Sequence, residues 1–119
     1  MAQHFKDLIA WQRAMDLVNA LYDATDAFPQ REIYSLTNQM HRAAVSVPSN
    51  IAEGQARYSN REFRHFLRNS HGSLAELETQ VLIAQRRDYL SEPQAAELIK
   101  RTDEVGRILG GLINSLSEK

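Results

Sequence analysis

Apolar residues recur three and four positions apart along most of the chain, a spacing that places side chains on one face of an α-helix. Four stretches carry this pattern, and none shows the sustained alternation that is typical of a half-buried β-strand. We therefore expect an all-α fold of four amphipathic helices, each of about 20–30 residues. The links between them are short, which favours an antiparallel up-down-up-down four-helix bundle.

The first stretch carries two neighbouring rows of apolar or small residues. One row contains Leu8, Trp11, Met15, Val18, Tyr22 and Thr25. The second row contains Ala14, Leu17, Leu21, Ala24 and Phe28. Together they make an apolar face that is wider than a two-helix seam requires. Pro29 is expected to stop this helix, because proline has no N–H and disfavours helical geometry in the residue before it.

The second stretch has its apolar row at Ile33, Leu36, Met40, Ala43, Val47 and Ile51. Pro48 lies inside this pattern and is expected to kink the helix, because it removes one hydrogen bond of the helical ladder. Gly54 is expected to mark the end of the helix or of its regular part.

The third and fourth stretches both open with a capping box. Ser59 and Glu62 frame the first, and Ser91 and Gln94 frame the second, which has Pro93 in its first turn. The third row contains Phe63, Leu67, Ser70, Leu74, Leu77, Val81 and Ala84. The fourth contains Ala95, Leu98, Thr102, Val105, Leu109, Leu112 and Leu116. Gly106 and Gly110 share a face of the fourth helix, where another backbone could approach closely or the helix end could fray.

Several apolar residues lie off the first or main row of their stretch: Leu21, Phe28, Leu82, Ile83, Ile99, Ile108 and Ile113. They cannot all point at one bundle axis. A broad core with some exposed apolar side chains is one interpretation. A second buried face, and hence a homo-oligomer, is the other, and it is favoured because the first and fourth helices both carry the excess. No repeat or long linker divides the chain, so we expect a single four-helix-bundle domain over residues 1–119.

Composition narrows the class of protein. Of the 119 residues, 43% are hydrophobic and 24% are charged, as in ordinary globular proteins, and there is no cysteine. Disulfides, thiol catalysis and thiolate-bound metals are therefore excluded. The start, Met1 to Asp7, lacks the pattern of a signal peptide, and no apolar run approaches the roughly 20 residues that cross a bilayer. We expect a cytoplasmic protein that does not enter membranes.

The net charge of −1 argues against a strongly basic nucleic-acid binder, but the charge is unevenly distributed. Residues 41–68 carry a net charge of +3, whereas the rest of the chain carries −4. The positive segment contains Arg42, Arg57, Arg61, Arg64 and Arg68, with Tyr58 among them. Arginines beside an aromatic residue can bind phosphates and stack on bases. They can also form a solvated face with ordinary ion pairs, which the small number of arginines favours, and both interpretations stay open.

A polar cluster surrounds the proline of the second helix. It comprises Ser46, Pro48, Ser49, Asn50, Glu53 and Gly54. Its side chains can bond the backbone groups that Pro48 leaves free, which would make the cluster structural. A self-association surface or a binding groove is the functional alternative.

Candidate chemistry is sparse. Glu62 and His65 form a Glu-x-x-His pair, but a di-metal bundle site needs two such pairs and two further glutamates, and no second pair occurs. Nucleophile-elbow and phosphate-loop sequences are absent as well. We predict no catalytic residue, metal, cofactor or small-molecule substrate, and we expect that the protein is not an enzyme. A metal-containing bundle enzyme is the weakest alternative.

The run from Gln39 to Gly54 is distinctive, QMHRAAVSVPSNIAEG. It resembles the corresponding segment of the 23S rRNA intervening-sequence protein family, also called the four helix bundle protein family. Phe5–Ala14, Phe28-Pro29 with Glu32 and Tyr34, and Gly72–Thr79 resemble the family's first helix, first link and third helix.

The resemblance implies a four-helix bundle that assembles as a ring-like homo-oligomer, a pentamer. Relatives include the accessory variability determinant of diversity-generating retroelements, a basic pentamer that binds reverse transcriptase and RNA. No enzymatic activity is established for the family. This chain departs from the nucleic-acid-binding relatives because it is slightly acidic, which argues against tight non-specific RNA binding. The leading hypothesis is a non-enzymatic oligomeric adaptor that binds RNA or a ribonucleoprotein through Arg42, Arg57, Arg61, Arg64 and Arg68. The alternative is a protein-only oligomeric scaffold that binds a protein partner.

Overall fold

The computed structural model describes residues 4–116, and within them the chain forms four α-helices and no β-strand. The helices are α1 (Ile9–Thr25), α2 (Leu36–Gln55), α3 (Asn60–Arg86) and α4 (Glu92–Ser115). Short 3₁₀ turns, η1 (Phe5–Asp7) and η2 (Gln30–Glu32), precede α1 and α2. The all-α prediction is confirmed. The expectation that the start of the chain lacks a signal peptide also covers residues 1–3, and these lie outside the described residues.

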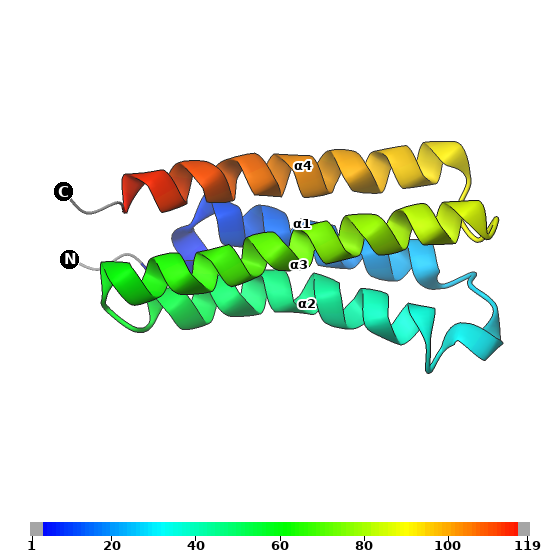
Figure 1. Ribbon diagram of the computed structural model, residues 1–119, viewed down its shortest axis with the longest axis horizontal. Coiled ribbons are helices and arrows are strands. Elements are labelled where there is room, and N and C mark those ends of the chain that lie inside the picture. Colours follow the sequence, from blue (N-terminus) through cyan, green and yellow to red (C-terminus); the bar gives the residue numbers. More distant parts are fainter. Residues whose placement is uncertain (1–3, 117–119) are drawn as a thin grey trace.

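The four helices run along the long axis of a molecule that measures 47 × 23 × 20 Å (Figure 1). The start of α1, the end of α4 and the α2–α3 turn lie at one end, and the other two connections lie at the opposite end. α2 packs against α1 and α3, and α4 packs against α3 and α1. Within residues 4–116 the two diagonal pairs make no close backbone contact, so the helices form an antiparallel bundle that is square in section.

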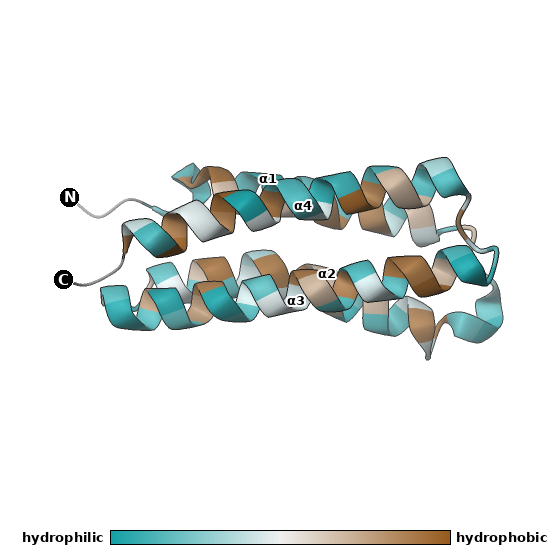
Figure 2. Cartoon of the chain, turned by 45° about the horizontal axis from the view of Figure 1, so that its top comes forward, coloured by the Kyte–Doolittle hydropathy of each residue, from teal (hydrophilic) through white to brown (hydrophobic). Residues whose placement is uncertain are grey.

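The core of α1 is built mainly from its second apolar row, which Ala10 extends toward the start of the helix, and only the ends of the first row, Leu8 and Thr25, are buried. Ala10, Ala14, Leu17 and Leu21 are fully buried. Met15 and Tyr22 of the first row are 38% and 41% exposed. Brown apolar residues and teal polar residues alternate within the turns of each helix (Figure 2). The expectation that Leu21 and Phe28 lie off the core is therefore wrong, because both are buried.

The first helix also ends earlier than Pro29 suggested. α1 stops at Thr25, and the following residues turn toward η2. Phe28 leaves the helix but still reaches the core, where its ring lies 5.4 Å from that of Tyr89. The turn, not the proline, redirects the chain here.

The second helix differs from its sequence prediction at its start and in the role of its glycine. Ile33 precedes α2 and is 45% exposed, so it does not extend the core row. α2 then continues through the buried Pro48 to Gln55. Gly54 is the penultimate residue of the helix, so the predicted end is correct to within one residue, but the glycine has no positive φ and does not form a left-handed cap. It serves instead as a contact point with α3: a Cβ built on Gly54 would lie 2.6 Å from Cβ of Phe66.

Capping at the helix starts follows the sequence in part. Ser91 and Gln94 form the reciprocal capping box of α4 as predicted. At α3, Ser59 Oγ accepts a bond from the Glu62 N–H, but the return bond from the Glu62 carboxylate is not formed. α2 is capped by a residue that the pattern did not single out, since Oε1 of Glu32 accepts the Leu36 N–H at 3.3 Å. The Tyr89 hydroxyl donates to the same carboxylate and, as the largest influence, lowers the pKa of Glu32.

Candidate interaction surfaces

The arginine-rich segment surrounds the α2–α3 turn, where Arg57 is held by its own neighbours. Its guanidinium lies 2.9 Å from Glu53 Oε2 and 3.9 Å from Glu62 Oε1. It also lies 5.0 Å from the centre of the Phe66 ring. Two carboxylates and an aromatic face therefore engage this side chain, and Arg57 helps to fix α2 against α3.

The three arginines of α3 differ in how far they are engaged. Arg64 is half-buried and donates a hydrogen bond to the backbone carbonyl of Leu116, which ties α3 to the end of α4. Arg61 and Arg68 are exposed, and neither forms an ion pair or hydrogen bond with another residue of the described part of the chain. Two cations on one side of α3 are thus available to a partner.

Arg42 lies apart from these arginines. It lies thirteen positions before the end of α2 at Gln55, which corresponds to about 20 Å along the helix axis from the α2–α3 turn. It is exposed and lines a separate polar hollow with Tyr34 and Glu76. The structure therefore divides the five predicted arginines into an occupied pair, a free pair on α3 and the distant Arg42.

Part of the predicted polar cluster on α2 faces α3. Asn50 Nδ2 donates to the Ser46 carbonyl at 2.8 Å, and the Ser46 hydroxyl contacts that of Ser73. Ser70, buried on α3, donates to the Val47 carbonyl at 2.8 Å. These bonds satisfy polar groups at the α2–α3 seam and connect the two helices across it.

The rest of the cluster is directed elsewhere. Pro48 and Ser49 lie toward α1, Glu53 pairs with Arg57, and Gly54 contacts Phe66. The six residues consequently do not form one surface. Most of their contacts are internal to the bundle. Asn50 bonds the Ser46 carbonyl and Glu53 pairs with Arg57, so neither bonds the Ala44 carbonyl that Pro48 leaves free.

An apolar groove of about 290 Å³ runs between α1 and α2. Its lining comes from Trp11, Met15, Val18, Val45, Pro48 and Ala52, with Ser49 as a polar member. Met15 is 38% and Val45 40% exposed. The sequence pattern identifies these α1 residues as apolar but does not distinguish them from the neighbouring row that faces the core. The groove leaves an apolar surface uncovered in the single chain.

Near the far end of the α1–α2 seam, His41 is enclosed by residues of α1. Its ring stacks on Tyr22 with centroids 3.9 Å apart, and its Nε2 lies 2.8 Å from Thr25 Oγ1. Burial lowers the pKa of His41 from its ordinary value of 6.5, and the nearby Asp26 carboxylate opposes part of this effect. The fold thus favours the neutral ring.

This environment predicts a pH-dependent stability. Because the folded-state pKa of His41 is lowered, the unfolded chain binds the proton more readily once the pH falls below 6.5. The stabilisation is complete above this pH and is lost as the pH falls through the folded-state pKa. Urea midpoints between pH 7.5 and 5.5 should decline less steeply for His41→Gln than for the wild type. Equal slopes would contradict this, and His65→Gln, at an exposed α3 position, is the control.

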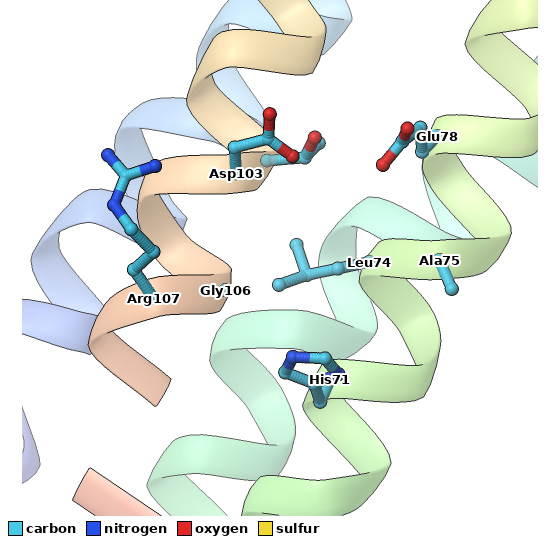
Figure 3. A pocket seen from close by; sticks show the side chains of 8 residues that line it. His71, Leu74, Ala75, Glu78, Asp103, Gly106 and Arg107 are labelled. Atoms are coloured by element: carbon cyan, nitrogen blue, oxygen red, sulfur yellow. The ribbon is translucent and has the colours of Figure 1, made fainter. Parts of the chain in front are cut away.

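A further hollow of about 360 Å³ lies between α3 and α4 (Figure 3). Leu74 points into it, and Gly106 leaves room above that side chain. His71 and Arg107 lie on one side, while Glu78 and Asp103 line the other. The hollow combines both signs of charge over a small apolar floor, and its lining includes no Phe, Tyr or Trp ring from residues 4–116.

The described residues contain no candidate metal centre. Within residues 4–116, no three His, Asp or Glu side chains gather in a way that could hold a metal ion. The predicted pair Glu62 and His65 is exposed at the start of α3, where Glu62 lies near Arg57. No helix in the same part of the chain is both long and apolar enough to cross a membrane.

Comparison with known proteins concerns the whole bundle. A family model described as 23S rRNA-intervening sequence protein matches residues 6–111. A crystal structure of a protein of unknown function from the S23 ribosomal protein family of Bacteroides thetaiotaomicron is similar, with a TM-score of 0.82 and 17% identity. The match covers 92% of this chain and 98% of that one, and at this identity it supports the fold alone. No curated protein matches the sequence.

Proposed function

Because the chain belongs to the 23S rRNA-intervening sequence protein family, we propose that it is a non-enzymatic, self-associating adaptor that binds RNA, free or within a ribonucleoprotein. The assembly would be a ring-like homo-oligomer, with five copies as the resemblance implies. A cytoplasmic location, expected from the sequence, fits this role. No catalytic step is part of the proposal.

The RNA-binding part of the proposal rests on exposed arginines that have no internal partner in the described part of the chain. Arg61 and Arg68 extend from the same side of α3, four and eleven residues after Arg57, in the positively charged segment. Guanidinium groups bind phosphate oxygens in a bidentate manner, and each such bond releases a counterion from the nucleic acid. A ring would repeat this pair in every copy, so that a modest footprint becomes multivalent.

The apolar groove between α1 and α2 supports the self-association part. Its exposed methionine and valine side chains gain free energy by leaving water, and a second copy of the chain is always present to cover them. A ring of more than two copies uses two different surfaces of each protomer, of which this groove would be one.

Titration of a labelled structured RNA tests the RNA-binding part. Anisotropy should report micromolar or tighter binding at low salt that weakens steeply toward physiological salt. The double variant Arg61→Ala/Arg68→Ala should weaken binding and reduce the slope of log K against log salt by about 0.7–0.9 for each phosphate that the variant no longer binds.

The matched control is Arg86→Ala/Arg87→Ala, which removes two exposed arginines at the opposite end of the bundle. It changes the net charge equally and should leave the salt slope close to that of the wild type. If both double variants weaken binding to the same extent, binding follows net charge and not the proposed surface. If the wild type does not bind even at low salt, the RNA-binding proposal is wrong.

The internal engagement of Arg57 and Arg64 favours a second candidate, a protein-only scaffold. Two of the five arginines stabilise the bundle, which reduces the cationic surface open to phosphates. In this alternative the apolar groove and the α3 surface bind subunits and a protein partner. A complex isolated with the protein would then survive nuclease treatment, whereas an RNA-bridged complex would dissociate.

A further inference from the structure

A polar hollow of about 440 Å³ lies between the start of α2 and the middle of α3. Its rim carries Tyr34, Asn38, Gln39, Arg42 and Glu76, and the buried Ala43 lies at its base. The volume falls in the range of small-ligand sites, which is about 300–1,000 Å³. The hollow is separate from the arginine pair of α3 and from the apolar groove.

The two charges of the hollow do not neutralise each other. Arg42 and Glu76 are both exposed and line the same space, but they form no ion pair with each other. Among residues 4–116, Arg42 has no hydrogen-bonded partner. Glu76 Oε2 accepts a hydrogen bond from the Gln80 amide at 3.3 Å, but that amide is uncharged and leaves the carboxylate without a counter-charge. A ligand therefore meets both a cation and a carboxylate.

The remaining groups suit a heteroaromatic ligand. Tyr34 is 95% exposed, so one face of its ring is open for stacking. Asn38 and Gln39 are exposed amides that both donate and accept hydrogen bonds, as base edges require. An exposed tyrosine, two amides, an arginine and a carboxylate around one hollow are the groups with which proteins bind unpaired nucleotides.

The carboxylate selects among the bases. Ionised Glu76 only accepts hydrogen bonds, through two oxygens side by side. Guanine presents two neighbouring donors, N1–H and the exocyclic amine, on its Watson–Crick edge. Adenine, cytosine and uracil each place an acceptor beside the donor on that edge, which a carboxylate would repel. Arg42 then remains for the phosphate.

We infer that this hollow binds a guanosine 5′-phosphate unit, with the base stacked on Tyr34, its donor edge on Glu76 and its phosphate on Arg42. The unit belongs either to a free nucleotide or to an unpaired guanosine in RNA. The inference rests on the proposed function only for the second of these sources.

Titration of the full chain with 5′-GMP, 5′-IMP and 5′-AMP, followed by NMR chemical shifts, tests the site directly. GMP should bind about tenfold more tightly than AMP, and IMP, which lacks the exocyclic amine, should lie between them. Glu76→Gln should abolish the preference for GMP over AMP. Tyr34→Ala should weaken the binding of all three nucleotides several-fold, because stacking does not distinguish bases.

Matched controls are Tyr58→Ala, a tyrosine that is 82% exposed in the turn after α2, and Glu78→Gln, on α3 but outside this hollow. Both should bind GMP as the wild type does. The inference is overturned if GMP, IMP and AMP bind equally, or if Tyr34→Ala and Glu76→Gln behave like these controls.

Two RNA oligonucleotides identify the source of the unit. One has a single unpaired guanosine, and in the other the same guanosine is paired in a duplex. Tighter, Tyr34-dependent binding of the first supports RNA as the source. Selective GMP binding without binding of either RNA supports a free nucleotide, and then the proposed function fails while the site stands. RNA binding without guanosine preference overturns the site and leaves the proposed function intact.

Discussion

Replacing Gly54 with alanine is expected to lower the free energy of unfolding by about 1–3 kcal/mol. The new Cβ would lie 2.6 Å from Cβ of Phe66 and 3.1 Å from Cδ1 of Phe63, both on α3. The nearer atom is a Cβ, whose position is fixed by the backbone and does not change with the rotamer. The clash is therefore relieved only if the two helices move apart. Urea unfolding followed by circular dichroism at a fixed protein concentration measures the effect.

Other glycines of the same chain provide the control. A Cβ on Gly72 or Gly110 meets nothing within 4 Å. Both lie inside helices, where alanine is favoured over glycine by about 0.5–1 kcal/mol. Gly72→Ala and Gly110→Ala should therefore stabilise the protein while Gly54→Ala destabilises it. Phe66→Ala should not rescue Gly54→Ala, since alanine keeps the offending Cβ. A Gly54→Ala protein as stable as the wild type would disprove the close approach.

Replacing Met15 with glutamate is expected to convert the proposed oligomer into single chains. Met15 is 38% exposed in the groove between α1 and α2, so a carboxylate there stays hydrated while the chain is alone. Association through the groove would have to dehydrate that carboxylate against Trp11, Val18 and Val45, at a cost of several kcal/mol per interface. Each 1.4 kcal/mol weakens association tenfold. Sedimentation velocity over a range of protein concentrations reports the change.

The fold of the single chain should survive this substitution, because glutamate and methionine have similar helix propensities. Ala96→Glu, at an exposed position of α4, adds the same charge away from the groove and should leave the oligomer intact. An oligomer that persists in Met15→Glu would place the interface on another surface. A wild-type protein that sediments as one chain at all concentrations would remove the self-association proposal.

Sequence patterns specify some elements of this bundle better than others. The α3 and α4 rows were predicted almost completely, because each helix has one dominant row and a serine at its start. In α1, two rows share the same period, and periodicity alone does not decide which faces the core. The row with Ala10 and Ala14 is buried because small residues let α1 approach its neighbours closely, and this depends on the partner helices.

Gly54 and the arginines show a second limit. A glycine near a helix end is typical of a terminus, and only the placement of Phe66, twelve residues later, reveals its role as a contact point. The sequence likewise predicts the positive charge of the segment but not which guanidiniums find partners. Arg57 and Arg64 are engaged by groups that the α2–α3 turn and the end of α4 bring near. The hollow beside Arg42 is lined in part by Glu76 from another helix, so no local sequence motif predicts it.

In the described part of the chain, three of the four seams between helices join sequence neighbours, and the α2–α3 seam is the most extensive. Only the seam between α1 and α4 brings together segments from opposite ends of the chain. Hairpins of adjacent helices cost little loop-closure entropy, whereas the last seam closes a loop of more than sixty residues. Such a topology has low contact order and folds rapidly. We expect the α2–α3 hairpin to form early and the docking of α1 onto α4 to complete the native bundle.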